Sequence, residues 1–305
     1  MPFKWLALAL CVTACGDLSN QDIAFLEAIP RKESLHVQVP DQGAQPLCGP
    51  GTFGDAEVWN NARRTGDALN AGVDGILGLV DKIRALPPTT RDEDSRVWGP
   101  FPDQQHPGVT IRVTLSRELD AHSIPWRYLY SIDARRAGAF LPLLAGEFYG
   151  AQASKGSGKL TIHFENALAL QTNKPDDPAS PERIFYDLAS EPRTVSLDLT
   201  DISAARLLKF DYGYVGYLDG HGRFDYAFPD KNGCVITVST SFTARGAGKG
   251  RLHFSCGGGV FVGDVVQCWN ENACLTRIED PYAFTPACGG LKPCLLGAAS
   301  SCAVP

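Results

Sequence analysis

Residues 210–228 read Phe-Asp-Tyr-Gly-Tyr-Val-Gly-Tyr-Leu-Asp-Gly-His-Gly-Arg-Phe-Asp-Tyr-Ala-Phe. Aromatic residues take every second position on both sides of the Asp219-Gly220-His221-Gly222 segment. Its aspartate and glycines are typical of a tight turn, because glycine adopts positive φ without steric cost. A period of two puts alternate side chains on opposite faces of a strand. This stretch therefore predicts an antiparallel hairpin with one aromatic face.

The same alternation recurs along much of the chain, with turn signals between the alternating stretches. Clean alternation of apolar and polar residues favours an antiparallel sheet with one covered face and one solvated face. Because the stretches follow one another closely, we expect about eight or nine strands joined as a meander. The alternating stretches are 109–115, 126–132, 160–164, 195–199, 210–214, 224–228, 234–242, 252–254 and 260–262.

One long helix is predicted, over residues 56–86. Asp55 can cap its first turn, and Pro87 ends it because proline cannot continue the hydrogen-bond pattern. The expected fold class is α+β and rich in β: a curved antiparallel meander sheet, with a half-barrel as one form it could take, covered by this helix. The apolar residues of the helix recur at spacings of three and four, which places them on one face: Leu69, Val73, Ile76, Leu77, Val80 and Ile83.

The first fifteen residues predict where the protein is located. Lys4 precedes an apolar run, 5–12, that is far too short to span a bilayer. The segment from Val12 to Cys15 resembles a bacterial lipobox, which implies removal of residues 1–14 as a lipoprotein signal peptide and acylation of Cys15. Gly16, rather than aspartate, follows the cysteine. This implies the outer membrane, on its periplasmic face or at the cell surface. The alternative is an ordinary signal peptide with a chance cysteine.

We expect one domain, because residues 172–183 are predicted to form a loop between strands and not a domain linker, and because no internal repeat is visible. Residues 15–54 are predicted to form the anchor, a short N-terminal segment and a linker. Residues 55–280 are predicted to form the antiparallel-sheet domain, and 281–305 a Cys-rich C-terminal tail.

Eight of the ten cysteines are candidates for disulfide bonds, because Cys11 leaves with the signal peptide and Cys15 takes the lipid. An even number in an oxidising compartment predicts four disulfides, without fixing which cysteines pair. A structural metal site is the less favoured alternative, since the chain has neither a Cys-x-x-Cys nor a His-x-x-x-His pair. The candidates are Cys48, Cys234, Cys256, Cys268, Cys274, Cys288, Cys294 and Cys302.

Composition and motifs exclude several functions. The chain has 28 Lys and Arg against 34 Asp and Glu, a formal net charge of −6. This argues against nucleic-acid binding, which needs a basic surface. The glycine-rich stretch 150–160 departs from a phosphate-binding loop at Ala153 and Leu160. Neither a His-Glu-x-x-His nor a Gly-x-Ser-x-Gly motif is present, so we expect no metal and no cofactor.

Two groups of residues in the opening stretch are candidates for function. Asp219, His221 and Asp225 could act as a general acid–base group, although a solvated hairpin turn is the simpler interpretation. An aromatic platform could bind an apolar ligand, although such residues more often form the core face of a sheet. The platform residues are Tyr212, Tyr214, Phe224 and Tyr226.

From about residue 109 to 280 the chain resembles a family of uncharacterised lipoproteins of myxobacterial type. The resemblance implies no catalytic residue and no known activity. Besides the lipobox, it depends on short glycine and tryptophan motifs: Leu144 with Gly146, Gly156-x-Gly158-x-Leu160, Gly246-x-Gly248-x-Gly250-Arg251 and Cys268-Trp269.

The sequence therefore predicts a non-enzymatic protein of the cell envelope. Its membrane partner would be reached through the lipid anchor, and its ligand would be an apolar small molecule or a lipid, held in a cavity between helix 56–86 and the sheet. An interaction surface for another protein is also consistent with the sequence, but no particular protein partner is indicated. The alternative is an envelope hydrolase that uses Asp219, His221 and Asp225.

Overall fold

The computed structural model describes residues 18–40, 48–84, 86–120, 123–150, 155–172, 179–203, 206–230, 233–259 and 261–302. The predicted signal peptide and Cys15 lie outside these residues.

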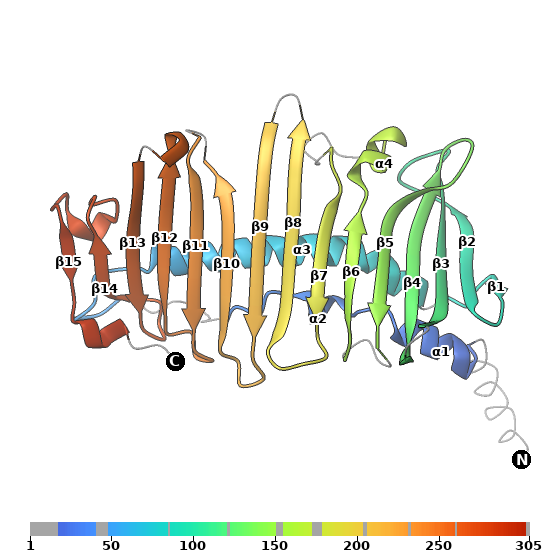
Figure 1. The fold of residues 1–305 in the computed structure, drawn as a ribbon, viewed down its shortest axis with the longest axis horizontal. Helices are drawn as coiled ribbons and strands as arrows, with labels where there is room; N and C mark the ends of the chain where they lie inside the picture. Colours follow the sequence, from blue (N-terminus) through green and yellow to red (C-terminus); the bar gives the residue numbers. More distant parts are fainter. Residues whose placement is uncertain are drawn as a thin grey trace, which may run out of the picture.

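Within the described residues, fifteen strands form one open sheet in which every strand pairs antiparallel with its neighbours in sequence. The strands therefore stand side by side in chain order, from β1 at one edge to β15 at the other (Figure 1). They are β1 Thr90–Arg91, β2 Ser95–Pro102, β3 Thr110–Asp120, β4 Ser123–Arg135, β5 Leu141–Tyr149, β6 Ser157–Ile162, β7 Glu182–Asp187, β8 Arg193–Ser203, β9 Arg206–Gly216, β10 Gly222–Pro229, β11 Val235–Phe242, β12 Gly248–Cys256, β13 Phe261–Trp269, β14 Leu275–Asp280 and β15 Cys294–Leu296.

Three helices precede the sheet: α1 Asn20–Glu27, α2 Lys32–Leu35 and α3 Glu57–Arg84. A fourth, α4 Phe164–Ala169, lies between β6 and β7, and three short 3₁₀ turns, η1 Gly257–Gly259, η2 Pro286–Cys288 and η3 Ala299–Cys302, lie near the C-terminal strands. α3 crosses behind the middle strands in the view of Figure 1.

The predicted fold class is wrong in its number of strands, its possible half-barrel and its covering helix. Fifteen strands in the described chain replace the expected eight or nine, and the sheet stays open. At ~4.8 Å per strand such a sheet is ~70 Å wide, whereas a 28-residue helix is ~42 Å long. α3 alone is therefore too short to cover the sheet. α1, α2 and the extended residues 36–40 share the covered face with it.

Glycine and proline hide several of the additional strands from a search for alternation. β2 contains Gly99 and Pro100 at an irregularity in its pairing with β3. β5 contains Pro142 and Gly146. Gly146 lies opposite Tyr130 of β4, and a Cβ atom at position 146 would collide with the Tyr130 ring. The missing apolar side chain of β5 is therefore replaced by a ring from the neighbouring strand.

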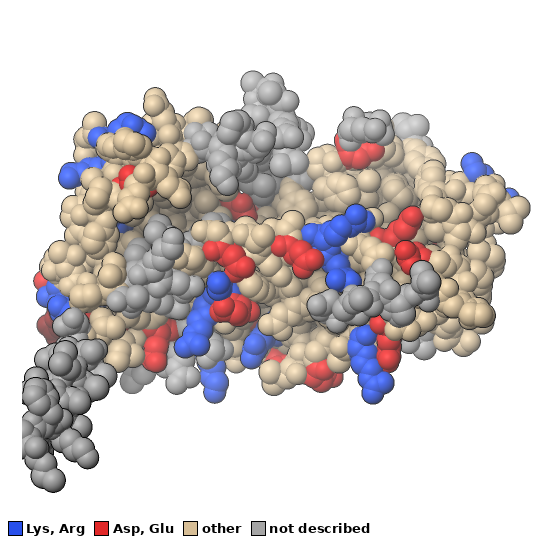
Figure 2. All heavy atoms as spheres, turned by 180° about the vertical axis from the view of Figure 1, so that it is seen from behind, with Lys and Arg blue, Asp and Glu red and all other residues tan. Residues whose placement is uncertain are grey.

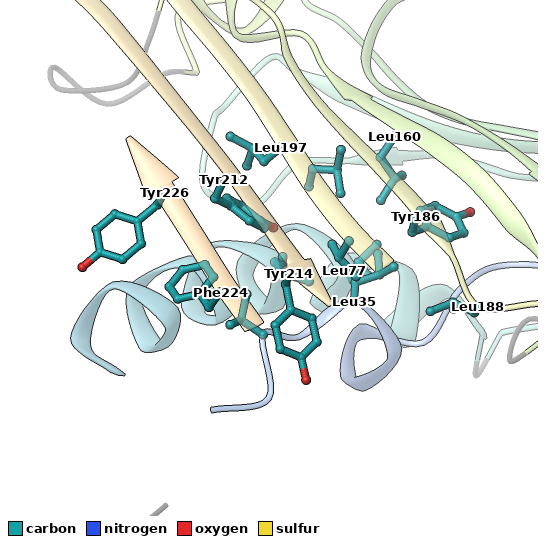
Figure 3. Packing of buried hydrophobic residues seen from close by; sticks show 14 of the residues in the cluster. Leu35, Leu77, Leu160, Tyr186, Leu188, Leu197, Tyr212, Tyr214, Phe224 and Tyr226 are labelled. Carbon is teal, nitrogen blue, oxygen red and sulfur yellow. The ribbon is translucent and has the colours of Figure 1, made fainter. Parts of the chain in front are cut away.

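The core lies between α3 and the covered face of the sheet. Trp59 of α3 is fully buried and contacts the rings of Phe242 on β11 and Trp269 on β13, with centroids 5.4 and 5.3 Å away. Figure 3 shows the same layer further along, where Leu77 of α3 lies among side chains of β6 to β10.

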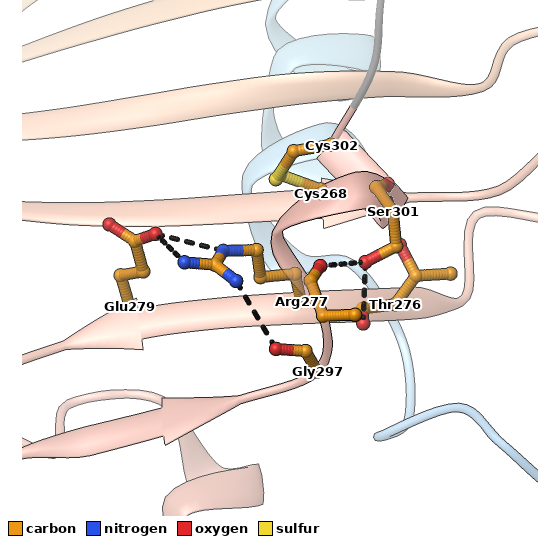
Figure 4. The surroundings of a disulfide bond; sticks show 8 residues. Cys268, Thr276, Arg277, Glu279, Gly297, Ser301 and Cys302 are labelled. Atoms are coloured by element: carbon orange, nitrogen blue, oxygen red, sulfur yellow. Dashed lines mark hydrogen bonds and ion pairs between the residues drawn. A yellow bond between two sulfur atoms is a disulfide. The ribbon is translucent and has the colours of Figure 1, made fainter.

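The eight predicted disulfide cysteines form four bonds: Cys48–Cys274, Cys234–Cys256, Cys268–Cys302 and Cys288–Cys294. The prediction of four disulfides is confirmed. Cys48–Cys274 fixes the segment before α3 to the residue that precedes β14. Cys268–Cys302 fixes η3 to β13, and Ser301 of η3 also donates a hydrogen bond to the carbonyl oxygen of Thr276 at 3.2 Å (Figure 4).

Candidate functional site

The predicted aromatic platform is part of the core. In the β9–β10 pairing, Tyr212 lies opposite Tyr226 and Tyr214 opposite Phe224. The structure thus brings all four rings together on the covered face (Figure 3). Each side chain is buried, with at most 6% of its surface exposed. These residues stabilise the contact with α3, and the four rings do not form one free binding surface; Tyr214 and Tyr226 also line the wall of a cavity or groove.

The alternating aromatic residues of β9 and β10 form a ladder that reaches an open groove at one end. Phe210 of β9 and Phe228 of β10 continue the same face and are only partly buried. Together with Tyr226 they form one wall of a groove of about 530 Å³, and α3 forms the other wall. The lining residues of α3 are Asn61, Arg64, Thr65, Ala68 and Leu69. Alternation in the sequence places Phe210 and Phe228 in the ladder but does not show that they line a groove beside α3.

The groove carries one cation that no carboxylate neutralises within the described part of the chain. Arg64 Nε donates to the Asn60 carbonyl oxygen at 3.3 Å, and Nη2 donates to Asn61 Oδ1 at 2.8 Å. Both acceptors are neutral. Burial raises the pKa of Tyr226, while a hydrogen bond with Thr65 and the charge of Arg64 act in the opposite direction. The Tyr226 hydroxyl is therefore close to both α3 residues.

The aspartate–histidine cluster does not assemble into one site. His221 contacts Asp219 Oδ1 through Nδ1, and its ring stacks on Tyr217 with centroids 3.9 Å apart. Asp219 is 69% exposed at the side chain. Asp225 lies four residues along β10 from His221, ~14 Å at strand spacing, and pairs with Arg223 at 2.6 Å. Asp219 and His221 contact each other within the turn, whereas Asp225 forms a separate surface ion pair with Arg223.

Other histidines of the described residues each contact one carboxylate. His106 contacts Asp103, His163 contacts Glu165, and His253 contacts Asp264. In the parts of the chain that the structure describes, no three His, Cys, Asp or Glu side chains are placed to hold a metal ion. The side of the sheet that carries α3 shows acidic and basic side chains intermixed, and neither sign gathers in one patch (Figure 2).

Comparisons with protein-family models, with curated proteins and with solved structures find no match to this chain. The resemblance to myxobacterial-type lipoproteins stays a prediction. Among the helices that the structure describes, none combines the length and the apolar character needed to cross a bilayer.

Proposed function

We propose that this chain is a non-enzymatic lipoprotein of the bacterial envelope that binds an anionic amphiphile, such as a fatty acid, in the groove between α3 and strands β9 and β10. The observation that carries the proposal is the pairing of partly exposed aromatic side chains, Phe210 and Phe228, with Arg64 in one open groove. An apolar chain on the two rings would gain burial, and the anionic head would face the guanidinium group.

The size and chemistry of the groove support an amphiphile. Its volume of about 530 Å³ is within the range of about 300–1,000 Å³ that small-molecule sites occupy. Burying apolar surface contributes roughly 25 cal/mol per Å², which favours a chain over a compact polar ligand. Arg64 has only neutral hydrogen-bond acceptors in the described chain, so an anionic head would not displace an existing ion pair.

The location of the protein is part of the same proposal. The lipobox at 12–15 supports acylation of Cys15, and Gly16 after it supports the outer membrane. Several acyl chains on one residue suffice for stable anchoring. An anchored protein with an apolar groove is suited to hold amphiphiles close to the membrane.

A fluorescent apolar probe tests the groove. The full chain is titrated with 1-N-phenylnaphthylamine, which dodecanoate or dodecanol then displaces. Ala68→Trp would fill the groove, because Ala68 is an exposed lining residue, and we expect probe binding to fall at least about tenfold, as 1.4 kcal/mol of lost burial would produce. Ala71→Trp is the matched control, since Ala71 is also exposed on α3 but does not line the groove. Equal probe binding by the two variants would contradict the proposal.

The head-group preference has its own test. Arg64→Gln should weaken dodecanoate about fivefold, as expected for loss of one exposed ion pair of about 1 kcal/mol, and leave dodecanol unchanged. An equal effect on both ligands would show that Arg64 does not recognise the anion.

The anchor is tested in cells of a bacterium that processes lipoproteins. The unchanged chain should fractionate with the outer membrane and carry a mass increase at Cys15. Cys15→Ser should abolish both, whereas Cys11→Ser should abolish neither. A soluble unchanged chain would exclude the anchor without affecting the test of the groove.

A further inference from the structure

A second cavity, of about 130 Å³, lies between the N-terminal segment and the ends of strands β8 and β9. It shares no lining residue with the groove of the proposed function. It is lined by Ser34, His36, Gln38, Arg193, Val195, Tyr214, Gly216, Tyr217, Leu218 and Gly220.

The register of the sheet explains why a cation lies in this cavity. Arg193 is the first residue of β8 and pairs with Gly216, while Val195 pairs with Tyr214. Alternation puts Arg193 on the same, covered face as Val195 and Tyr214. Burial raises the pKa of Tyr214, and the charge of Arg193 acts against that rise. The guanidinium group is thus near the Tyr214 hydroxyl, within the cavity wall.

Arg193 has no hydrogen bond or ion pair with any other residue that the structure describes. The nearby carboxylates are engaged elsewhere: Asp74 accepts from His36 Nε2 at 2.8 Å, Asp219 contacts His221, and Glu191 accepts from the backbone N–H of Leu218. A half-buried guanidinium with no carboxylate partner favours an anion from outside the chain.

The cavity offers one further polar donor, because Ser34 is among its lining residues. His36 Nε2 donates to Asp74, so the neutral ring keeps only an acceptor at Nδ1 and adds no donor for an anion. The Tyr214 hydroxyl donates to the Gln38 carbonyl oxygen at 3.4 Å and fixes the N-terminal segment over the strands.

The rim of the cavity is apolar and exposed. Tyr217 is 38% exposed and Leu218 76% exposed, in the turn between β9 and β10. Stacking of Tyr217 on His221, together with the contact from His221 to Asp219, keeps this turn ordered. The contact between His221 and Asp219, which suggested a catalytic group, therefore supports a turn that places Tyr217 and Leu218 beside the cavity that Arg193 lines.

We propose that this cavity binds the carboxylate or phosphate group of a small molecule whose apolar part lies on Tyr217 and Leu218. A volume of about 130 Å³ corresponds to roughly four water molecules at ~30 Å³ each. The cavity holds one anionic group, and the remainder of the ligand extends along the rim.

Calorimetric titration of the full chain with hexanoate, hexyl phosphate and inorganic phosphate tests this site. We expect at least one hexyl probe to bind, and Arg193→Gln to weaken that probe at least about tenfold, the scale of a charge-assisted hydrogen bond. The stronger hexyl probe identifies the anion as carboxylate or phosphate. Leu218→Ser should weaken the hexyl probes several-fold and leave any binding of inorganic phosphate unchanged.

Two controls make the outcome decisive. Arg223→Gln removes an exposed arginine that already pairs with Asp225, and should not change binding. Arg64→Gln reports on the groove: if it abolishes probe binding and Arg193→Gln does not, the probe occupies the groove and the second site is refuted. Failure of all three probes at 10 mM, or equal affinity of inorganic and hexyl phosphate, would also overturn the proposal. Thermal unfolding of each variant shows whether it is folded.

Discussion

Trp269 lies directly opposite Gly248 across strands β13 and β12, and its ring covers the glycine. A Cβ atom at position 248 would stand 2.6 Å from Trp269 Cζ2. Trp269 Nε1 is held by the Gly246 carbonyl oxygen at 2.8 Å. The ring is buried and anchored by this hydrogen bond, so the position opposite it favours glycine.

The first prediction follows from this contact. Gly248→Ala should lower the free energy of unfolding by about 1–3 kcal/mol, because a methyl group would overpack a fully filled core. Gly213→Ala is the matched control: it is also a strand glycine, but a Cβ atom there would meet nothing within 4 Å. We expect the control to be neutral or slightly stabilising. Urea unfolding of both variants measures the difference, and equal midpoints would refute the steric argument.

The second prediction ranks two disulfides by the length of chain they close. Cys48–Cys274 joins residues 226 apart, and Cys288–Cys294 joins residues 6 apart. Loop-closure entropy predicts that replacing both cysteines by serine costs about 5 kcal/mol for the long loop and about 2 kcal/mol for the short one. Chemical unfolding of the two double variants tests the ranking. A larger loss for Cys288 and Cys294 would show that local strain or packing outweighs entropy.

The third prediction concerns a buried ion pair that fixes α1 to the first strands. Burial alone would raise the pKa of Asp22, but hydrogen bonds from the Ser19 N–H and from the arginines Arg96 and Arg91 hold it well below its ordinary value. Asp22 is fully buried and Arg96 nearly so. Asp22→Asn leaves a buried cation without its partner, so we expect a loss of about 3–5 kcal/mol at pH 7.

The pH dependence of that loss can be stated with its sign. The pKa of Asp22 is lower in the folded than in the unfolded chain, so its ionised form stabilises the fold above about pH 4, and this contribution falls as the pH drops further. The difference between the unchanged protein and Asp22→Asn should shrink below about pH 4. Asp264→Asn is the control: its exposed pair with Arg251 should be worth less than about 1 kcal/mol. A pH-independent difference for Asp22→Asn would contradict the assignment.

The fourth prediction has the opposite sign. Burial raises the pKa of Glu182, on the covered face of β7, to about 7. Below about pH 4 the carboxyl is protonated in both the folded and the unfolded chain. Between about pH 4 and 7 the unfolded chain ionises first, so the folded state loses stability. Glu182→Gln should therefore gain about 1–3 kcal/mol over the unchanged protein at pH 8, and almost nothing at pH 4.

Glu147→Gln is the contrasting variant for this measurement. Its hydrogen bond from Arg127 lowers the pKa of Glu147, so removal of the carboxylate should reduce stability at pH 8. Urea unfolding at pH 4, 6 and 8 compares the two variants. A destabilised Glu182→Gln at pH 8 would mean that the carboxylate has a stabilising partner in the native protein.

The alternation of apolar and polar residues predicted strands correctly where it continues unbroken along a strand. The hairpin at 210–228 forms with the predicted turn, and its aromatic residues face the core. The same reasoning missed β5, because Pro142 and Gly146 break the alternation. It also missed β7, which begins within the loop expected at 172–183.

The two candidate binding sites were outside the reach of local pattern for a different reason. The groove joins α3 to β9 and β10, and the smaller cavity joins residues 34–38 to β8 and β9. Arg193 and Leu218 have no distinctive spacing, so nothing in the sequence marks them. Arg193 matters because the nearby carboxylates already have other partners, and Leu218 matters because it lies at the rim of the same cavity. Both properties depend on contacts between residues that are distant in the sequence.

By itself the sequence determined the hairpin at 210–228, a long helix after Asp55 and an even set of cysteines for disulfides, because each depends on neighbours in the chain or on a count. Only the tertiary structure decided that the sheet has fifteen strands in its described residues, that aromatic rings replace side chains missing at glycines, and that the aromatic ladder is core. Those outcomes depend on which strands lie next to one another. Side chains alternate with a period of two in an inner strand, an edge strand and a strand beside a groove alike, so the alternation cannot distinguish these positions.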